Sequence, residues 1–377
     1  MPERTDWSAP VPPRYLGAGG TLQLRYCETI DYFVSCVAMV ENLRKSSRSI
    51  KILPLLLILC SSPARAQAPE LVWPHPPDRA RIRFVQTIAS LENLESKKGF
   101  FAKLLGFFAG QEQTPRWLVQ PVGIAVAPNG RIYVADPEAN GVHVIDQKER
   151  KYEFLAGTKS GPFLSPVGVV VTDGGGLYIS DSQRGEVVAL DSDYDFLFAI
   201  RERLQRPTGL SIKNGILFVA DAGRHTVVRF DLNGKYIGEF GRRGDAKGEF
   251  NFPVSITVGA ADTSGLYVVD ALNHRVQEFD TAGRYLSSFG RHGNVSGCFA
   301  SPKSIARDSD GDLYVTDALM DNIQIFNPEG KLGLIVGRSG SGDGEFSSPS
   351  GIAIDRDDRI YVVETLNRRI QVFQYLK

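Results

Sequence analysis

The chain has 377 residues, of which 42% are hydrophobic and 23% charged, and 43 Lys and Arg residues balance 43 Asp and Glu residues. This balance argues against a dedicated nucleic-acid binder, because such proteins collect phosphates with an excess of basic residues. The aromatic content of 10% excludes a disordered or collagen-like chain, and four cysteines are too few for a disulfide framework.

Residues 39–68 have the pattern of a secretory signal peptide. Basic residues precede an apolar run at residues 52–60 that is too short to span a bilayer. Ala64 and Ala66 then fit an A-x-A cleavage site, and we expect cleavage after Ala66. The sequence therefore predicts an exported protein of the periplasm or cell envelope. We interpret residues 1–38 as a misassigned upstream start or a disordered extension.

Two features leave membrane association open. Cys60 could bear the lipid of a lipoprotein, although Leu59 is larger than the residue that lipoprotein signals place before the cysteine. Residues 95–110 place apolar side chains at helical spacing with lysines beside them. We predict a short helical insertion that packs on the fold, and the alternative is a docking or membrane-surface helix over residues 97–108.

One phrase recurs six times between residues 119 and 377: a proline, an apolar run, a turn, a second apolar run with an aromatic residue, and a carboxylate. The prolines are 45, 41, 46, 49 and 47 residues apart. A period of 40–50 residues with several short strands is typical of a β-propeller blade. We predict an all-β, six-bladed β-propeller with four-stranded antiparallel blades. The defining pairs are Pro121 and Asp136, Pro166 and Asp181, Pro207 and Asp221, Pro253 and Asp270, Pro302 and Asp317, and Pro349 and Glu364.

The repeats also resemble the NHL-repeat family. The likeness is carried by residues 270–280 and 364–373 and by the Gly- and Arg-rich segments 240–250 and 336–346, and it extends over about residues 119–377. Repeats two and three depart from the family pattern, because Arg184 and Arg224 stand where the family favours Asn. The resemblance implies a propeller, and it extends to exported bacterial six-bladed propellers of this family.

The sixth repeat ends before it can form a fourth strand, which would leave an open sheet edge. Residues 81–89 alternate as a strand does and are similar to the fourth strands predicted at residues 236–240 and 285–289. We therefore predict that this N-terminal strand completes the sixth blade and closes the ring. We expect one propeller over residues 69–377, and a monomer.

Strand direction alternates within a blade, so the starts of the first strands, the loops between strands two and three, and the linkers between blades must share one face, which we call the linker-side face. This face collects basic residues, whereas the opposite face takes Asp-rich turns. We expect a protein or a small anionic ligand to bind the linker-side face. The candidate residues are Arg206, Arg242, Arg243, Arg291, His292 and Lys303.

The chemistry of the repeats favours binding over catalysis. A carboxylate at the same place in every repeat is typical of a loop anchor, and we predict that the repeated arginines pair with these carboxylates across blades. The positions beside each proline hold no His, Asp or Glu, and no Gly-x-Ser-x-Gly elbow or phosphate loop is present. We therefore predict a non-catalytic binding or scaffold protein without a cofactor. The alternatives are a metal-dependent lyase or hydrolase of the propeller type and, for the cofactor, a calcium ion on the axis.

Overall fold

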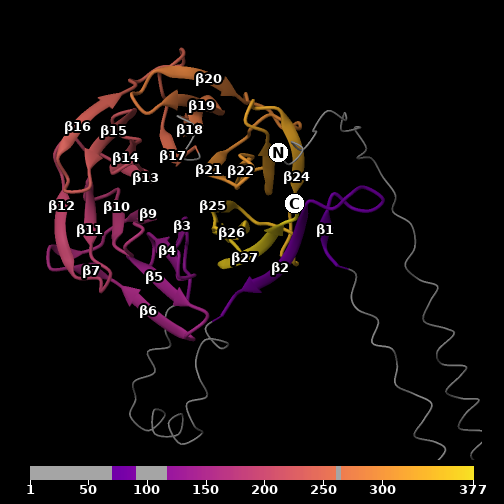
Figure 1. Ribbon diagram of the computed structural model, residues 1–377, viewed down its shortest axis with the longest axis horizontal. Coiled ribbons are helices and arrows are strands. Elements are labelled where there is room, and N and C mark those ends of the chain that lie inside the picture. The colour runs from indigo at the N-terminus through magenta and orange to yellow at the C-terminus, as the bar shows by residue number, and fades with distance from the viewer. Residues whose placement is uncertain (1–69, 91–116, 260–264) are drawn as a thin grey trace, which may run out of the picture. The chain divides into compact units, whose positions relative to one another are not determined.

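The computed structural model describes residues 70–90, 117–259 and 265–377. In this part of the chain six antiparallel sheets form a ring around a central axis (Figure 1). The prediction of an all-β, six-bladed propeller is confirmed. The proposed signal peptide, the extension at residues 1–38, Cys60 and the helical insertion at residues 95–110 all lie outside the described residues.

Blades 1 to 3 follow one another in sequence, and in each the first strand lies nearest the axis (Figure 1). Blade 1 consists of β3 (Gly123–Val126), β4 (Ile132–Asp136), β5 (Gly141–Asp146) and β6 (Lys151–Leu155). A small hairpin of β7 (Gly157–Thr158) and β8 (Gly161–Pro162) leads to blade 2, which consists of β9 (Pro166–Val171), β10 (Leu177–Asp181), β11 (Glu186–Leu190) and β12 (Phe196–Ile200). Blade 3 consists of β13 (Pro207–Lys213), β14 (Ile216–Asp221), β15 (Thr226–Asp231) and β16 (Tyr236–Phe240).

Blades 4 to 6 repeat this order, with one short 3-10 helix, η1 (Ala271–Asn273), between two strands of blade 4. Blade 4 consists of β17 (Pro253–Val258), β18 (Gly265–Asp270), β19 (Arg275–Asp280) and β20 (Tyr285–Phe289). Blade 5 consists of β21 (Pro302–Arg307), β22 (Leu313–Asp317), β23 (Asn322–Phe326) and β24 (Leu332–Val336). Blade 6 begins with β25 (Pro349–Ile354), β26 (Arg359–Glu364) and β27 (Arg369–Tyr375).

The N-terminal part of the propeller completes blade 6. Strand β2 (Ile82–Ile88) pairs antiparallel with β27, with Ile82 opposite Tyr375 and Ile88 opposite Ile370. The predicted closing strand is therefore present, within one residue of its predicted ends. A further strand that the sequence did not predict, β1 (Val72–Trp73), pairs with the outer side of β2. Two residues are too few to show alternation, so this strand is recognisable only in three dimensions.

The apolar core is divided among the interfaces between blades. Each of six clusters of buried side chains draws on two neighbouring blades; one joins Ile124 of blade 1 to Val363 of blade 6, for example. The second and third strands of the blades are buried on both faces, which explains their continuous apolar character. Because every blade is stabilised by its two neighbours, the ring depends on the seam between blades 6 and 1.

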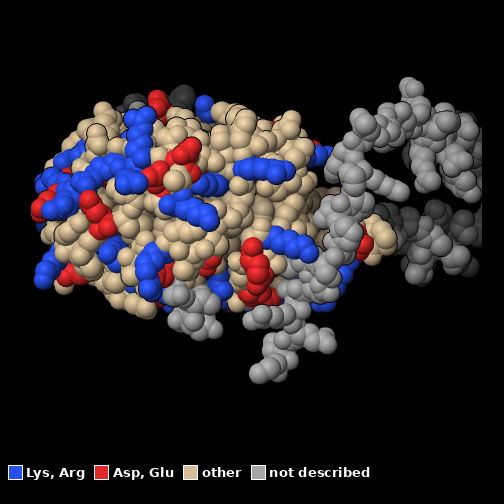
Figure 2. All heavy atoms as spheres, turned by 90° about the horizontal axis from the view of Figure 1, so that it is seen from above, with Lys and Arg blue, Asp and Glu red and all other residues tan. Residues whose placement is uncertain are grey.

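The fourth strands of most blades carry a β-bulge. In blades 2, 3, 4 and 6 the register skips one exposed apolar residue in the fourth strand, and bulges of this kind twist an edge away from pairing with other chains. In the view of Figure 2, Lys and Arg lie intermixed with Asp and Glu on the side of the molecule that faces the reader. The skipped residues are Leu197, Ile237, Leu286 and Val85.

Within the described ranges, no helix is long and apolar enough to cross a membrane.

Candidate functional site

The linker-side face is organised by the carboxylate at the end of each second strand. In blade 1, Asp136 Oδ2 accepts the amide N–H of Val119 at 2.7 Å, and Oδ1 accepts those of Gln120 at 3.0 Å and Ala139 at 3.1 Å. The carboxylate therefore fixes the approach to the first strand and the loop between strands two and three. Asp181, Asp221 and Asp317 make the same contacts in blades 2, 3 and 5.

The electrostatic balance at these anchors differs between blades. Burial opposes ionisation of Asp136, but the neighbouring His143 and the three amides outweigh it, so the pKa of Asp136 lies below its usual value. At Asp270 burial is the larger effect, and the pKa of this carboxyl is raised. All these carboxylates are buried and hydrogen-bonded to groups of their own loops and linkers, which supports their interpretation as anchors.

Blades 4 and 6 add an arginine to the anchor. Arg275 Nε lies 2.9 Å from Asp270 Oδ2, and its two terminal nitrogens donate to the backbone carbonyls of Asp245, Ala246 and Glu249. Arg369 pairs in the same way with Glu364 in blade 6. These pairs lie within one blade, so the prediction of arginine–carboxylate pairs across blades is wrong. The guanidinium instead bridges its own blade to the preceding linker.

The degenerate repeats use their arginines differently. Arg184 pairs with Glu186, and Arg224 pairs with Glu239, rather than with the anchors of their blades. Without Asn and Arg at the family positions, the anchor carboxylate accepts backbone amides of its own loop instead.

Three linkers of one design follow blades 3, 4 and 5, at residues 241–252, 290–301 and 337–348, and we call them the long linkers. Each starts at a glycine with φ between 85° and 89°, where a Cβ would lie within 2.4 Å of a buried phenylalanine ring. A short parallel bridge closes each linker. The glycine and phenylalanine pairs are Gly241 and Phe250, Gly290 and Phe299, and Gly337 and Phe346.

The middle long linker lacks the glutamate that the other two share. Arg242 pairs with Glu249 at 2.7 Å, and Arg338 pairs with Glu345 at 2.9 Å. Arg242 also holds the pKa of Glu249 below its usual value. The middle linker has Cys298 at the glutamate position, so Arg291 makes no ion pair with any described residue.

The structure places the candidate binding residues on the linkers and on β21. Arg206, Arg243, Arg291 and Lys303 are exposed, and their side chains form no hydrogen bond or ion pair with another described residue. The ring of His292 lies against that of His274, with centroids 4.4 Å apart. Arg242 is exposed but neutralised by Glu249. Three leucines on the same face are also exposed and were not among the predicted residues, namely Leu272, Leu319 and Leu366.

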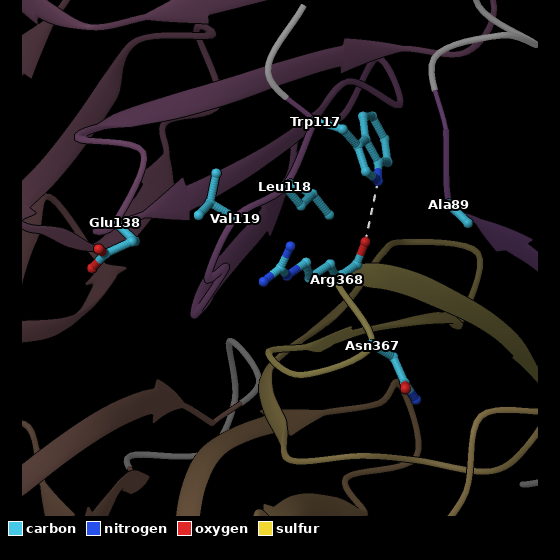
Figure 3. Close-up of a pocket in the computed structure, with 7 residues that line it drawn as sticks. All are labelled: Ala89, Trp117, Leu118, Val119, Glu138, Asn367 and Arg368. Atoms are coloured by element: carbon cyan, nitrogen blue, oxygen red, sulfur yellow. Dashed lines mark hydrogen bonds between the residues drawn. The ribbon is translucent and has the colours of Figure 1, made fainter.

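A cavity of about 620 Å³ opens at the seam between blades 6 and 1, on the linker-side face. Figure 3 shows the indole of Trp117 pointing toward the backbone of Arg368, whose carbonyl accepts its Nε1–H at 3.1 Å. The lining includes one carboxylate, Glu138, and one guanidinium, that of Arg368. No histidine or second carboxylate joins them among the described lining residues, so the cavity has no general acid–base pair.

The opposite face has a cavity of about 560 Å³ beside the turns of blades 1, 5 and 6. Its carboxylates form turns: Asp308 accepts the amides of Asp310 and Asp312, and Tyr314 donates to it at 2.9 Å. Burial raises the pKa of Asp308 to about 6, and nearby carboxylates add to the effect. In the described part of the chain, no group of three or more His, Cys, Asp or Glu side chains is placed to hold a metal ion.

Comparison with protein families agrees with this geometry. The NHL repeat matches residues 118–145 and 204–230, and a family described as a six-bladed β-propeller matches residues 304–375. The chain is a six-bladed β-propeller with NHL repeats. No curated protein matches this NHL propeller in sequence.

Solved structures share the propeller fold at low sequence identity. A streptogramin B lyase is 14% identical with a TM-score of 0.53, over 70% of this chain and 95% of the lyase. A catalytically inactive virginiamycin B lyase from Staphylococcus aureus with quinupristin is 16% identical with a TM-score of 0.53, over 70% and 97%. An auxiliary nutrient binding protein from Bacteroides thetaiotaomicron is 16% identical with a TM-score of 0.56, over 69% and 70%. These similarities show the fold alone, since one fold serves both lyases and a binding protein.

Proposed function

We propose that this NHL propeller is an exported, non-catalytic binding protein of the cell envelope, and that its linker-side face takes a partner with anionic groups. The observation that carries the proposal is a difference in pairing on that face: the anchor carboxylates are hydrogen-bonded within the fold, whereas three cations have no ion-pair partner among the described residues. The six anchor carboxylates are buried and hydrogen-bonded, whereas Arg243, Arg291 and Lys303 are exposed and form no ion pair with a described residue.

Other observations support the proposal. Unpaired cations on a rigid scaffold attract and orient an anionic partner without a cost for breaking internal ion pairs. The signal peptide that the sequence predicts at residues 39–68 favours a partner in the envelope. The nutrient binding protein shows that a propeller of this shape can serve binding.

Charge reversal on the two faces tests the proposal. The protein with Arg243→Glu, Arg291→Glu and Lys303→Glu is compared with a control that carries Lys148→Glu, Lys235→Glu and Lys331→Glu. The control makes the same change in net charge at exposed lysines in the opposite-face turns of blades 1, 3 and 5. Partners are captured from envelope extract and quantified by mass spectrometry. We expect the linker-face variant to lose the partners that the control keeps; equal capture by both would overturn the proposal.

The second candidate is a metal-dependent lyase or hydrolase, which the fold shared with the two lyases favours. Metal analysis of the natively purified protein separates the two functions. One transition metal per chain, removed together with a lyase or hydrolase activity, would establish the enzyme. A stoichiometric calcium without activity would fit an ion on the axis of a binding protein.

A further inference from the structure

Three leucines at one loop position are exposed on consecutive blades. Leu272, Leu319 and Leu366 each lie two residues after the anchor carboxylate of blades 4, 5 and 6, and they are 54%, 74% and 69% exposed. The same position holds a polar residue or glycine in the other blades, namely Glu138, Gln183 and Gly223. A single exposed leucine needs no explanation, but a repeated one confined to half of a face does.

The fold does not require these leucines. The exposed apolar residues of the outer strands lie at β-bulges. The loop leucines do not lie at bulges, and it is the backbone N–H groups of these residues that are hydrogen-bonded to the fold. The Leu272 N–H donates to the Asn251 carbonyl at 3.0 Å, and the Leu319 N–H donates to Asp317 Oδ1 at 3.1 Å. Leu366 N–H reaches the Ser347 carbonyl at 3.4 Å. The loops are thus pinned, while the side chains remain available for contact.

A fourth exposed apolar residue lies between two of these loops. Val295, in the middle long linker, is 58% exposed. This linker contacts the blade 4 loop through the rings of His292 and His274. It contacts strand β23 of blade 5 through the Cys298 carbonyl, which accepts from Gln324 Nε2 at 2.7 Å. We call Leu272, Val295, Leu319 and Leu366 the leucine arc.

Unpaired cations lie in and beside the middle long linker, whereas the two outer long linkers also have the exposed carboxylates of Asp245 and Asp343. Arg291 lies in the same linker as Val295 and lacks the glutamate that its counterparts have, and Lys303 is the second residue of β21, which follows that linker. Glu249 and Glu345 are already paired with Arg242 and Arg338. A partner on the arc therefore meets apolar side chains with unpaired cations between them.

We propose that the leucine arc docks a protein segment that has apolar side chains interspersed with carboxylates. This inference rests on the proposed function and names the class of its partner. A small anion would gain nothing from leucines on separate blades, whereas an extended segment of about 12 residues spans about 40 Å and can pass over several loops. Paired glutamates on two of the three long linkers also make the face less suited to an anionic lipid surface than to a segment with individual carboxylates.

The test selects peptides of about 12 residues from a random phage-displayed library against the intact protein. The leucine variant has Leu272→Ser, Leu319→Ser and Leu366→Ser. Its control has Leu197→Ser, Ile237→Ser and Leu286→Ser, which removes the same number of exposed apolar residues from the outer wall. We expect enriched peptides to combine Leu, Ile or Phe with Asp or Glu. The leucine variant should bind them at least about tenfold more weakly, and the control should bind them as the unaltered protein does. Equal melting temperatures establish that the variants are folded.

Each other outcome overturns the inference in a recognisable way. Absence of enrichment, or enriched peptides that bind the leucine variant unchanged, excludes the leucine arc as the docking site. Binding to phosphatidylglycerol vesicles that depends on the leucines would assign the arc to a membrane, and concentration-dependent dimerisation lost in the leucine variant would assign it to a second copy. If the charge-reversal variant loses its partners while the leucine variant keeps them, the proposed function stands and the leucine arc does not.

Discussion

The linker-side face differs between its two halves, although the same carboxylate anchor holds every blade. Over blades 4 to 6 it has the three long linkers and the leucine arc, and in blades 4 and 6 Asn and Arg residues also hold the preceding linker. Over blades 1 to 3 the connections at residues 156–165 and 201–206 are shorter, and the corresponding loop positions are polar. Because the carboxylate anchor is common to all six blades, we associate recognition with the long linkers and the leucine arc, which occur on blades 4 to 6 alone among the described blades.

The two halves meet at the seam between blades 6 and 1, and we expect the largest loss of stability from a change there. Deletion of residues 70–89 removes β1 and β2 with the buried Ile82 and Ile88, and it exposes the apolar side chains of blades 5, 6 and 1 that pack against them. Loss of several buried apolar side chains costs several kcal/mol, so we expect the melting temperature to fall by on the order of 10–20 °C relative to a protein that lacks only residues 1–69. An unchanged melting temperature would contradict closure by β2.

The next prediction compares an arginine brace in each half. Arg369→Ala should destabilise the protein by about 3–5 kcal/mol, because it leaves the buried Glu364 without its cation and releases the linker carbonyls. Arg224→Ala removes a partly exposed pair with Glu239 and should cost at most about 1 kcal/mol. Denaturant unfolding measures both, and Arg368→Ala is the exposed control. If both variants lost the same free energy of unfolding, the arginine of blade 6 would not stabilise the protein more than that of blade 3.

A buried carboxyl on the opposite face, Asp308, should make the stability of the protein depend on pH. The pKa of Asp308 is about 6 in the folded protein against an ordinary value of 3.8, so the folded state holds this proton more tightly. The free energy of unfolding should therefore fall as pH rises from about 4 to about 7, by up to about 3 kcal/mol from this group. Urea unfolding across this range should show the slope in the unaltered protein and in Asp355→Asn, and a much smaller slope in Asp308→Asn. The same slope in Asp308→Asn would rule out Asp308 as its source.

The smallest expected effect concerns the middle long linker. Cys298→Glu gives this linker the glutamate of its two counterparts, and the new carboxylate should pair with Arg291 as Glu249 does with Arg242. We expect acidic peptides selected on the unaltered protein to bind about threefold to tenfold more weakly, with association less sensitive to salt. Fluorescence anisotropy at two salt concentrations measures this. Unchanged affinity would mean that Arg291 does not contact the partner.

The sequence predicted the fold well because the fold depends on recurring residues. The prolines, the carboxylates and the alternation of residues 81–89 each reflect a local requirement that every blade meets. The site was harder to predict, because exposure and pairing depend on contacts between distant residues. Asp-Ala-Leu at residues 270–272 and 317–319 reads as an ordinary turn, and only the folded chain shows that its leucine is left uncovered. The missing partner of Arg291 was in principle visible, since Cys298 stands where residues 249 and 345 are glutamate.

Hydrogen–deuterium exchange of the protein, alone and with a selected peptide, tests the division of the face most directly. We expect the peptide to slow exchange at the loops 271–274, 318–321 and 365–368 and in the middle long linker at residues 290–301. Exchange at the equivalent loops of blades 1 to 3, residues 137–140, 182–185 and 222–225, should be unchanged. Protection confined to the loops of blades 1 to 3, or to the turns of the opposite face, would contradict binding at blades 4 to 6.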